Sequence, residues 1–144
     1  MKPVEDAKTP AAKILVVEDE MPVAMMMVFL LHRAGCEVAT ATNAEQAVRL
    51  VQAADFDLIT LDIDLPGGNG FEIFARLKKL PSWQNTPVVF VSGRPYGEDQ
   101  QRATELGAVD FISKPFDVQD FVSRILSHAT PKHDFILATE GASA

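Results

Sequence analysis

Short apolar segments alternate along the chain with stretches of helical periodicity. Four segments are almost continuously apolar or β-branched, at residues 14–17, 58–61, 88–91 and 111–112, and a fifth at 37–41 alternates more. Between them, apolar residues recur at i, i+3, i+4 and i+7, as in helices that bury one face. The pattern predicts five strands, each followed by a helix, near residues 13–18, 37–41, 57–62, 87–92 and 110–113.

Local signals support several of these helices. Asn43 stands at an N-cap position with Gln46 three residues later, and Gly35 and Gly107 stand where left-handed C-caps are expected. In the first helix the helical spacing is carried by Val23, Met26, Met27, Leu30 and Ala34. This spacing assigns the run Met25-Met26-Met27 to the core.

Strands joined by helical crossovers run parallel, and a parallel sheet is covered on both faces. The first, third and fourth segments are the most continuously apolar, so we expect them at the centre of the sheet and the other two at its edges. A strand order of 2-1-3-4-5 meets this requirement. The sequence therefore predicts an α/β protein, a (βα)₅ flavodoxin-like three-layer sandwich at residues 12–128, with tails at 1–11 and 129–144.

Composition narrows the functional classes. The 144 residues carry a formal net charge of −7, which disfavours binding to a nucleic-acid backbone or an anionic membrane surface. A single cysteine, Cys36, excludes an internal disulfide, and we expect it to be a small buried residue. The N-terminus does not read as a secretory signal, and the longest apolar run, 23–31, is roughly half of a membrane span. We expect a cytoplasmic protein.

Acidic side chains follow the two strands that meet where the strand order reverses. Ligands of such sheets bind beyond the carboxyl ends of the strands at this point. The acids are Glu18, Asp19 and Glu20 after the first strand, and Asp62 and Asp64 after the third. Two carboxylates about 4 Å apart repel by roughly 4 kcal/mol at an effective dielectric constant of 20. A hard divalent cation with oxygen ligands relieves this repulsion, and Mg²⁺ is the expected one.

Two further polar residues follow neighbouring strands. Ser92 ends the fourth strand, and Lys114 follows the fifth directly before Pro115. A hydroxyl and an ammonium group that face a carboxylate–metal cluster are suited to hold a tetrahedral anion such as a phosphoryl group.

These residues resemble the response-regulator receiver domains of two-component systems, over roughly residues 12–128. The resemblance is carried by four segments in the right order, namely Val17-Glu18-Asp19, Leu61-Asp62-Ile63-Asp64-Leu65-Pro66 with Gly70 eight positions after Asp62, Val91-Ser92-Gly93, and Phe111-Ile112-Ser113-Lys114-Pro115-Phe116.

The resemblance implies a role for each matching residue. Asp62 becomes the phosphoacceptor. Asp19, Asp62 and the backbone carbonyl of Asp64 become Mg²⁺ ligands, with Glu18 acting through water. The remaining roles fall to three residues near the other strand ends: Lys114 contacts the phosphoryl group, Ser92 reorients toward it, and Phe111 is the aromatic switch. The Lys114–Pro115 bond is expected to be cis.

The same resemblance implies partners and an output. A phosphohistidine on a sensor histidine kinase or a histidine phosphotransfer protein is the expected donor, and a downstream protein is the expected target. The roughly 15 residues after residue 128 are too few for a DNA-binding domain, unless the chain is a piece of a larger protein. Residues 97–106 form the least apolar helix, so we expect this helix, the fifth strand and the last helix to make up the face that changes on phosphorylation. The oligomeric state is left open.

Three points stay open at the level of sequence. Glu18, Ser92 and Phe111 stand where this family often has Asp, Thr and Tyr, and an ion pair between Asp64 and Arg94 above the site is a hypothesis. A phosphorylation-independent interaction module on the same fold is an alternative. An Asp-nucleophile phosphatase is a weaker one, because Asp62-Ile63-Asp64 resembles the D-x-D motif of haloacid-dehalogenase enzymes but the acid pair precedes it and no cap segment is present.

Overall fold

The structure, a computed structural model, describes residues 11–93 and 97–130. Its five strands are β1 (Lys13–Val17), β2 (Glu37–Ala41), β3 (Leu58–Leu61), β4 (Val88–Ser92) and β5 (Asp110–Ser113). Its helices are α2 (Met21–Arg33), α3 (Ala44–Ala53), α4 (Gly70–Lys78), α5 (Gly97–Leu106) and α6 (Val118–His128). Each predicted strand is present within one residue of its expected bounds.

The strands form one parallel sheet in the order β2-β1-β3-β4-β5, which confirms the predicted topology. β3 and β4 are buried throughout, and β1 is buried except at Lys13. β2 and β5 alternate with exposed or half-buried positions, as expected for edge strands. The polar content of each segment therefore predicted its place in the sheet.

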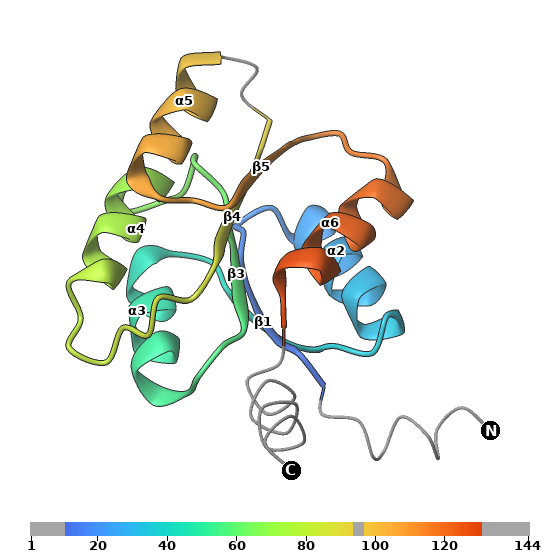
Figure 1. Cartoon of the computed structure of the whole chain (residues 1–144), viewed down its shortest axis with the longest axis horizontal. Coiled ribbons are helices and arrows are strands. Elements are labelled where there is room, and N and C mark those ends of the chain that lie inside the picture. Colours follow the sequence, from blue (N-terminus) through green and yellow to red (C-terminus); the bar gives the residue numbers. More distant parts are fainter. Residues whose placement is uncertain (1–10, 94–96, 131–144) are drawn as a thin grey trace, which may run out of the picture.

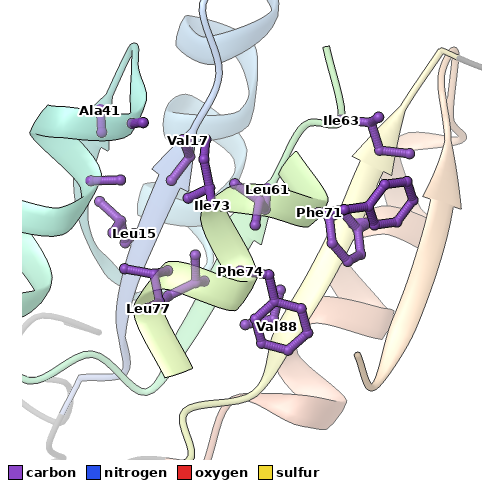
Figure 2. Packing of buried hydrophobic residues seen from close by; sticks show 14 of the residues in the cluster. Leu15, Val17, Ala41, Leu61, Ile63, Phe71, Ile73, Phe74, Leu77 and Val88 are labelled. Atoms are coloured by element: carbon purple, nitrogen blue, oxygen red, sulfur yellow. The ribbon is translucent and has the colours of Figure 1, made fainter. Parts of the chain in front are cut away.

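Helices cover both faces of this sheet, so the molecule has three layers (Figure 1). Because successive strand residues point to opposite faces, β1 contributes Leu15 and Val17 to one core and Ile14 and Val16 to the other. The first core packs against α3, α4 and Ala103 of α5, and the second against α2 and α6. Figure 2 shows the α4 side chains lying over the central strands in the first core.

The predicted caps are present. The Asn43 side chain accepts a hydrogen bond from the Gln46 N–H at 2.9 Å, which starts α3. Gly35 and Gly107 have φ of +95° and +102°, so both occupy the left-handed region after a helix. Cys36 is buried as expected.

The assignment of all three consecutive methionines to the core is wrong for two of them. Met27 is buried, whereas Met25 and Met26 are 64% and 41% exposed. Nearly every residue of α2 before His32 is apolar, so spacing alone does not define which face meets the sheet. The sheet buries Ala24, Met27 and Leu31 instead.

Candidate functional site

The carboxyl ends of β1 and β3 lie side by side and bring two acids together. Val17 and Leu61 are paired in the sheet, so the residues that follow them, Glu18 and Asp62, are neighbours. The ladder continues one step, since the Asp62 N–H donates to the Val17 carbonyl at 3.1 Å. Both acids are buried, with 1% and 4% of their surface exposed. The expected convergence of the two acidic strand ends is present.

Lys114 supplies the cation that these acids need. Its backbone N–H donates to the Ser92 carbonyl at 2.8 Å, which fixes the end of β5 beside β4. Its ammonium group lies 2.9 Å from Glu18 Oε1, 3.3 Å from Asp62 Oδ2 and 3.4 Å from Glu20 Oε1. Lys114, which follows β5, therefore contacts acids that follow β1 and β3.

Burial and charge shift the pKa values of this cluster. Burial raises the pKa of Glu18 to about 7, and the charge of Asp62 adds to this effect while Lys114 opposes it. Burial also acts to lower the pKa of Lys114, but its hydrogen bonds and charge interactions with Glu18 and Asp62 outweigh burial and raise it. The neighbouring acids therefore favour the charged form of Lys114, whereas burial disfavours the charged form of Glu18.

Backbone amides orient the same carboxylates. The Asp64 N–H donates to Asp62 Oδ1 at 3.2 Å, and the Glu20 N–H donates to Glu18 Oε2 at 3.2 Å. Each buried acid thus accepts one amide from the chain two residues later, while its other oxygen faces Lys114. This arrangement holds Asp62 with one oxygen toward the ammonium group.

Three carboxylates are close enough to share a cation. One oxygen each from Glu18, Glu20 and Asp62 lies within 4.8 Å of the others. Oxygen donors of this kind match the preference of Mg²⁺. Glu20 is an addition to the expected ligand set; it belongs to the predicted acidic run, but its position as N-cap of α2 does not by itself predict that its side chain turns toward Asp62.

The cluster opens into a pocket of about 880 Å³. Asp19 and Asp64 are the other two predicted ligands. Both line this pocket, but neither belongs to the three-acid cluster. The pocket is lined by Asp19, Glu20, Val23, Met26, Asp62, Asp64, Gly93, Lys114, Pro115 and Phe116. It gives the otherwise buried Asp62 a route to solvent.

Gly70 lets α4 start directly behind the acid. A Cβ atom at this position would lie 2.3 Å from the Asp62 carbonyl oxygen, and the Gly70 N–H donates to the Ile63 carbonyl at 2.7 Å. Asn69 and Glu72 form a reciprocal capping box at the same helix start. The glycine eight positions after Asp62 is therefore required by close backbone approach.

Ser92 and Phe111, the two remaining predicted site residues, lie in different surroundings. Ser92 is fully buried at the end of β4, next to Gly93 of the pocket. Phe111 is half-buried and packs on Phe90 with ring centroids 6.5 Å apart. It lines a separate groove of about 660 Å³ between α5, β5 and α6.

The Lys114–Pro115 bond is cis, as expected. Arg94, the partner in the hypothetical ion pair, lies outside the described residues.

Hydrogen bonds between β5 and α6 beside Phe111 were not predicted from the sequence. Arg124 of α6 donates to both carboxylate oxygens of Asp110 and to the Phe111 carbonyl, the last at 3.1 Å. His128 Nε2 lies 3.2 Å from Asp110 Oδ2. These bonds lower the pKa of Asp110 although its burial acts to raise it. They tie the first residues of β5 to α6.

The chain matches known proteins over most of its length. The family model described as response regulator receiver domain matches residues 14–126. The phosphate regulon transcriptional regulatory protein PhoB of Escherichia coli (strain K12) is 40% identical over 115 residues, which are 80% of this chain and 50% of that protein. The transcriptional regulatory protein TcrA of Mycobacterium tuberculosis (strain ATCC 25618 / H37Rv) is 35% identical over 113 residues, 78% of this chain and 44% of that protein. The chain spans about half the length of these curated relatives.

Solved structures agree with the fold. A putative response regulator from Chloroflexus aurantiacus J-10-fl has a TM-score of 0.77 at 28% identity, covering 83% of this chain and 98% of that one. The chemotaxis protein CheY4 of Vibrio cholerae has a TM-score of 0.76 at 28% identity, covering 82% and 98%. Across the described residues, no helix is both long and apolar enough to cross a membrane. The strand-end acids, the lysine opposite them and these matches together show that the chain belongs to the family of response regulator receiver domains.

Proposed function

We propose that Asp62 accepts a phosphoryl group from a phosphohistidine of a sensor histidine kinase or a histidine phosphotransfer protein. The observation that carries this proposal is the Lys114 ammonium group, which lies 3.3 Å from Asp62 Oδ2 at the base of a pocket open to solvent. Receiver domains are signalling domains rather than multiple-turnover enzymes, so the product is a phosphorylated protein.

The transfer follows from the contacts of Asp62. A carboxylate oxygen of Asp62 forms the new O–P bond while the N–P bond of the phosphohistidine breaks, and the imidazole keeps the electron pair of that bond. Phosphoryl transfer has a loose transition state, so the protein contributes position and charge. The Asp64 amide holds Oδ1 of the carboxylate, and Lys114 offsets negative charge on the arriving oxygens.

The donor set fits a magnesium ion. Glu18, Asp19, Asp62 and the backbone carbonyl of Asp64 are the proposed ligands, Glu18 through water, and Glu20 joins them because its carboxylate lies in the three-acid cluster. The bound ion would offset the charge that Asp62 and the phosphoryl group bring together. Within residues 11–93 and 97–130, the one lysine Lys114 faces three acids, which supports the need for a second cation.

The proposed response to phosphorylation lies on the face formed by α5, β5 and α6. Ser92 reorients toward the phosphoryl group, and Phe111, packed against Phe90 one strand away from Asp62, is the aromatic switch. Two of the ten residues of α5 are buried, so this helix can shift at low cost. A downstream protein that recognises this face is the proposed target.

Peptide mapping tests the acceptor. The protein is incubated with acetyl phosphate and Mg²⁺, the acyl phosphate is trapped by borohydride reduction, and the peptide spanning residues 50–76 is sequenced by mass spectrometry. This peptide also contains Asp55, Asp57 and Asp64 as internal controls. We expect reduction at Asp62, and modification at another of the four aspartates would contradict the proposal. Sustained hydrolysis of a phosphomonoester would instead favour a phosphatase.

Hydrogen exchange tests the switching face. With beryllofluoride as a phosphoryl mimic, we expect the amides of 97–106 and 110–113 to change their exchange rates. Amides of α4 should keep theirs, because five of its nine residues are buried. Strong protection of 97–106 that does not respond to beryllofluoride would contradict this part of the proposal.

A further inference from the structure

The pocket above Asp62 has two unlike sides. Its polar side carries four carboxylates and the lysine, from Asp19, Glu20, Asp62, Asp64 and Lys114. Its other side is apolar and is formed by Val23, Met26, Pro115 and Phe116. Binding of a metal ion and a phosphoryl group does not by itself require a thioether or a phenyl ring in the pocket lining.

The apolar side comes from two elements on one face of the sheet. Val23 and Met26 lie on α2, and Pro115 and Phe116 lie between β5 and α6 (Figure 1). The Phe116 ring stacks on Phe121 with centroids 4.5 Å apart and planes 16° apart, and Phe121 is fully buried in the core. Phe116 is thus held in place, whereas Met26 lines the pocket from α2 and is 41% exposed.

Water must pass this opening to hydrolyse a phosphoryl group on Asp62. Asp62 is 4% exposed and Glu18 1% exposed, so the pocket is the open approach among the described residues. Apolar side chains offer water no hydrogen bond, and excluding water protects a reactive intermediate from hydrolysis. The polar side can position a water molecule, whereas the apolar side limits how many reach it.

We propose that Met26, which lines the pocket together with Phe116, restricts water access to the acyl phosphate on Asp62 and thereby sets its lifetime. The proposal rests on the proposed function of Asp62. In the reaction that it slows, the oxygen of water bonds to phosphorus and the O–P bond to Asp62 breaks. The carboxylate is regenerated, inorganic phosphate leaves, and the released proton passes to solvent.

The neighbouring methionine provides a matched control. Met25 is 64% exposed and does not line the pocket, whereas Met26 does. After phosphorylation with acetyl phosphate and Mg²⁺, excess donor is removed and the decay of the phosphorylated protein is followed by intact mass. We expect Met26→Ala to shorten the lifetime by about threefold to tenfold, Met26→Leu to restore most of it, and Met25→Ala to leave it unchanged.

A second measurement separates water access from weakened phosphoryl binding. Beryllofluoride occupies the site of the phosphoryl group without hydrolysis by this route, so its affinity should be the same for Met26→Ala and the wild type. A wild-type lifetime in Met26→Ala would overturn the inference. An equal loss in Met25→Ala, or a parallel loss of beryllofluoride affinity, would also overturn it. A wild-type protein that takes up no phosphate would instead refute the function proposed for Asp62.

Discussion

The neighbouring helices α4 and α5 lie on the same face of the sheet but are held in different ways. α4 buries five of its nine residues, and its side chains reach the central strands (Figure 2). α5 buries two of ten, and one of these is the acid Asp99. The other is Ala103, and Leu106 at the end of α5 is half-buried. The helix behind Asp62 is therefore fixed by the core, whereas the helix of the proposed switching face is not.

Two contacts between these helices are made by basic side chains. Arg102 of α5 lies over the Phe71 ring of α4 at 4.5 Å, and the ammonium group of Lys78 on α4 donates to the Leu106 carbonyl at the end of α5. Contacts of this kind are weaker than apolar burial and can be exchanged for water. The difference shows that one layer of helices contains a helix that is fixed by apolar burial and a helix that buries little.

The largest effect is expected from truncation of the α4 core. Phe74 is 3% exposed and contacts Phe90 and Trp83, so Phe74→Ala should lower the free energy of unfolding by about 3–5 kcal/mol. Leu106→Ala on α5 should cost about 1 kcal/mol, since that side chain is half-buried. Urea denaturation measures both. Equal losses would show that α5 is as firmly held as α4.

Each of the two helices begins with a glycine, and these glycines differ in their surroundings. A Cβ at Gly70 would lie 2.3 Å from the Asp62 carbonyl oxygen, whereas one at Gly97 would meet nothing within 4 Å. We expect Gly70→Ala to destabilise the protein by about 1–3 kcal/mol and to slow phosphorylation by acetyl phosphate. Gly97→Ala should stabilise it by about 0.4–1 kcal/mol. Thermal unfolding compares them, and a tolerated Gly70→Ala would contradict the close approach described for α4.

A third change tests whether β5 is held by α6 rather than by α5. Asp110→Asn weakens the bonds to Arg124 and should cost about 1–2 kcal/mol at pH 7. Because these bonds lower the folded-state pKa of Asp110, its contribution is present above the unfolded pKa and is lost as pH falls through the folded value. The difference from wild type should therefore vanish at a pH below the lowered pKa of Asp110, where the carboxyl is protonated in both states.

The control for this experiment is Asp120→Asn. Asp120 also pairs with Arg124, at 3.2 Å, but its side chain is 52% exposed, so its loss should cost less than about 0.5 kcal/mol. Urea denaturation at several pH values gives both differences. A pH-independent loss in Asp110→Asn would show that geometry, rather than the charge of Asp110, holds β5 to α6.

The smallest effect on stability is expected from the contact between Arg102 of α5 and Phe71 of α4. Arg102→Ala removes the cation–π contact with Phe71 and should lower global stability by about 0.5–1 kcal/mol. It should nonetheless speed exchange of the α5 amides, while Gln101→Ala, at an exposed position of the same helix, should not. Unchanged α5 exchange in Arg102→Ala would mean that this contact does not anchor the helix.

The strand order could be predicted from the sequence because a strand that is buried on both faces consists of a continuous run of apolar residues. β3 and β4 are such strands, and β2 and β5 are more polar because they lie at the edges. The buried face of α2 was not predictable in the same way. When a helix is apolar on nearly every side, the sequence pattern does not show which side faces the sheet. Packing in the folded protein therefore decides that Met27 is buried and that Met26 borders the pocket.

The site likewise contains residues whose positions follow from the topology and residues whose contacts depend on side-chain direction. Topology alone brings Glu18, Asp62 and Lys114 to one edge of the sheet, so their meeting could be predicted. Side-chain direction decides that Glu20 joins the cluster, and that Arg124 of α6 reaches Asp110 on another element. Neither contact follows from spacing, because a surface acid or arginine can turn toward several partners.

Intact-mass analysis with acetyl phosphate tests the central claim most directly. Wild type and Asp62→Asn are incubated with the donor, in Mg²⁺ and in EDTA, and their masses are followed over time. We predict that the wild type gains the mass of one phosphoryl group in Mg²⁺ and little or none in EDTA, while Asp62→Asn gains none in either. A wild type that stays unmodified in Mg²⁺, or an Asp62→Asn variant that gains the same mass, would contradict the account.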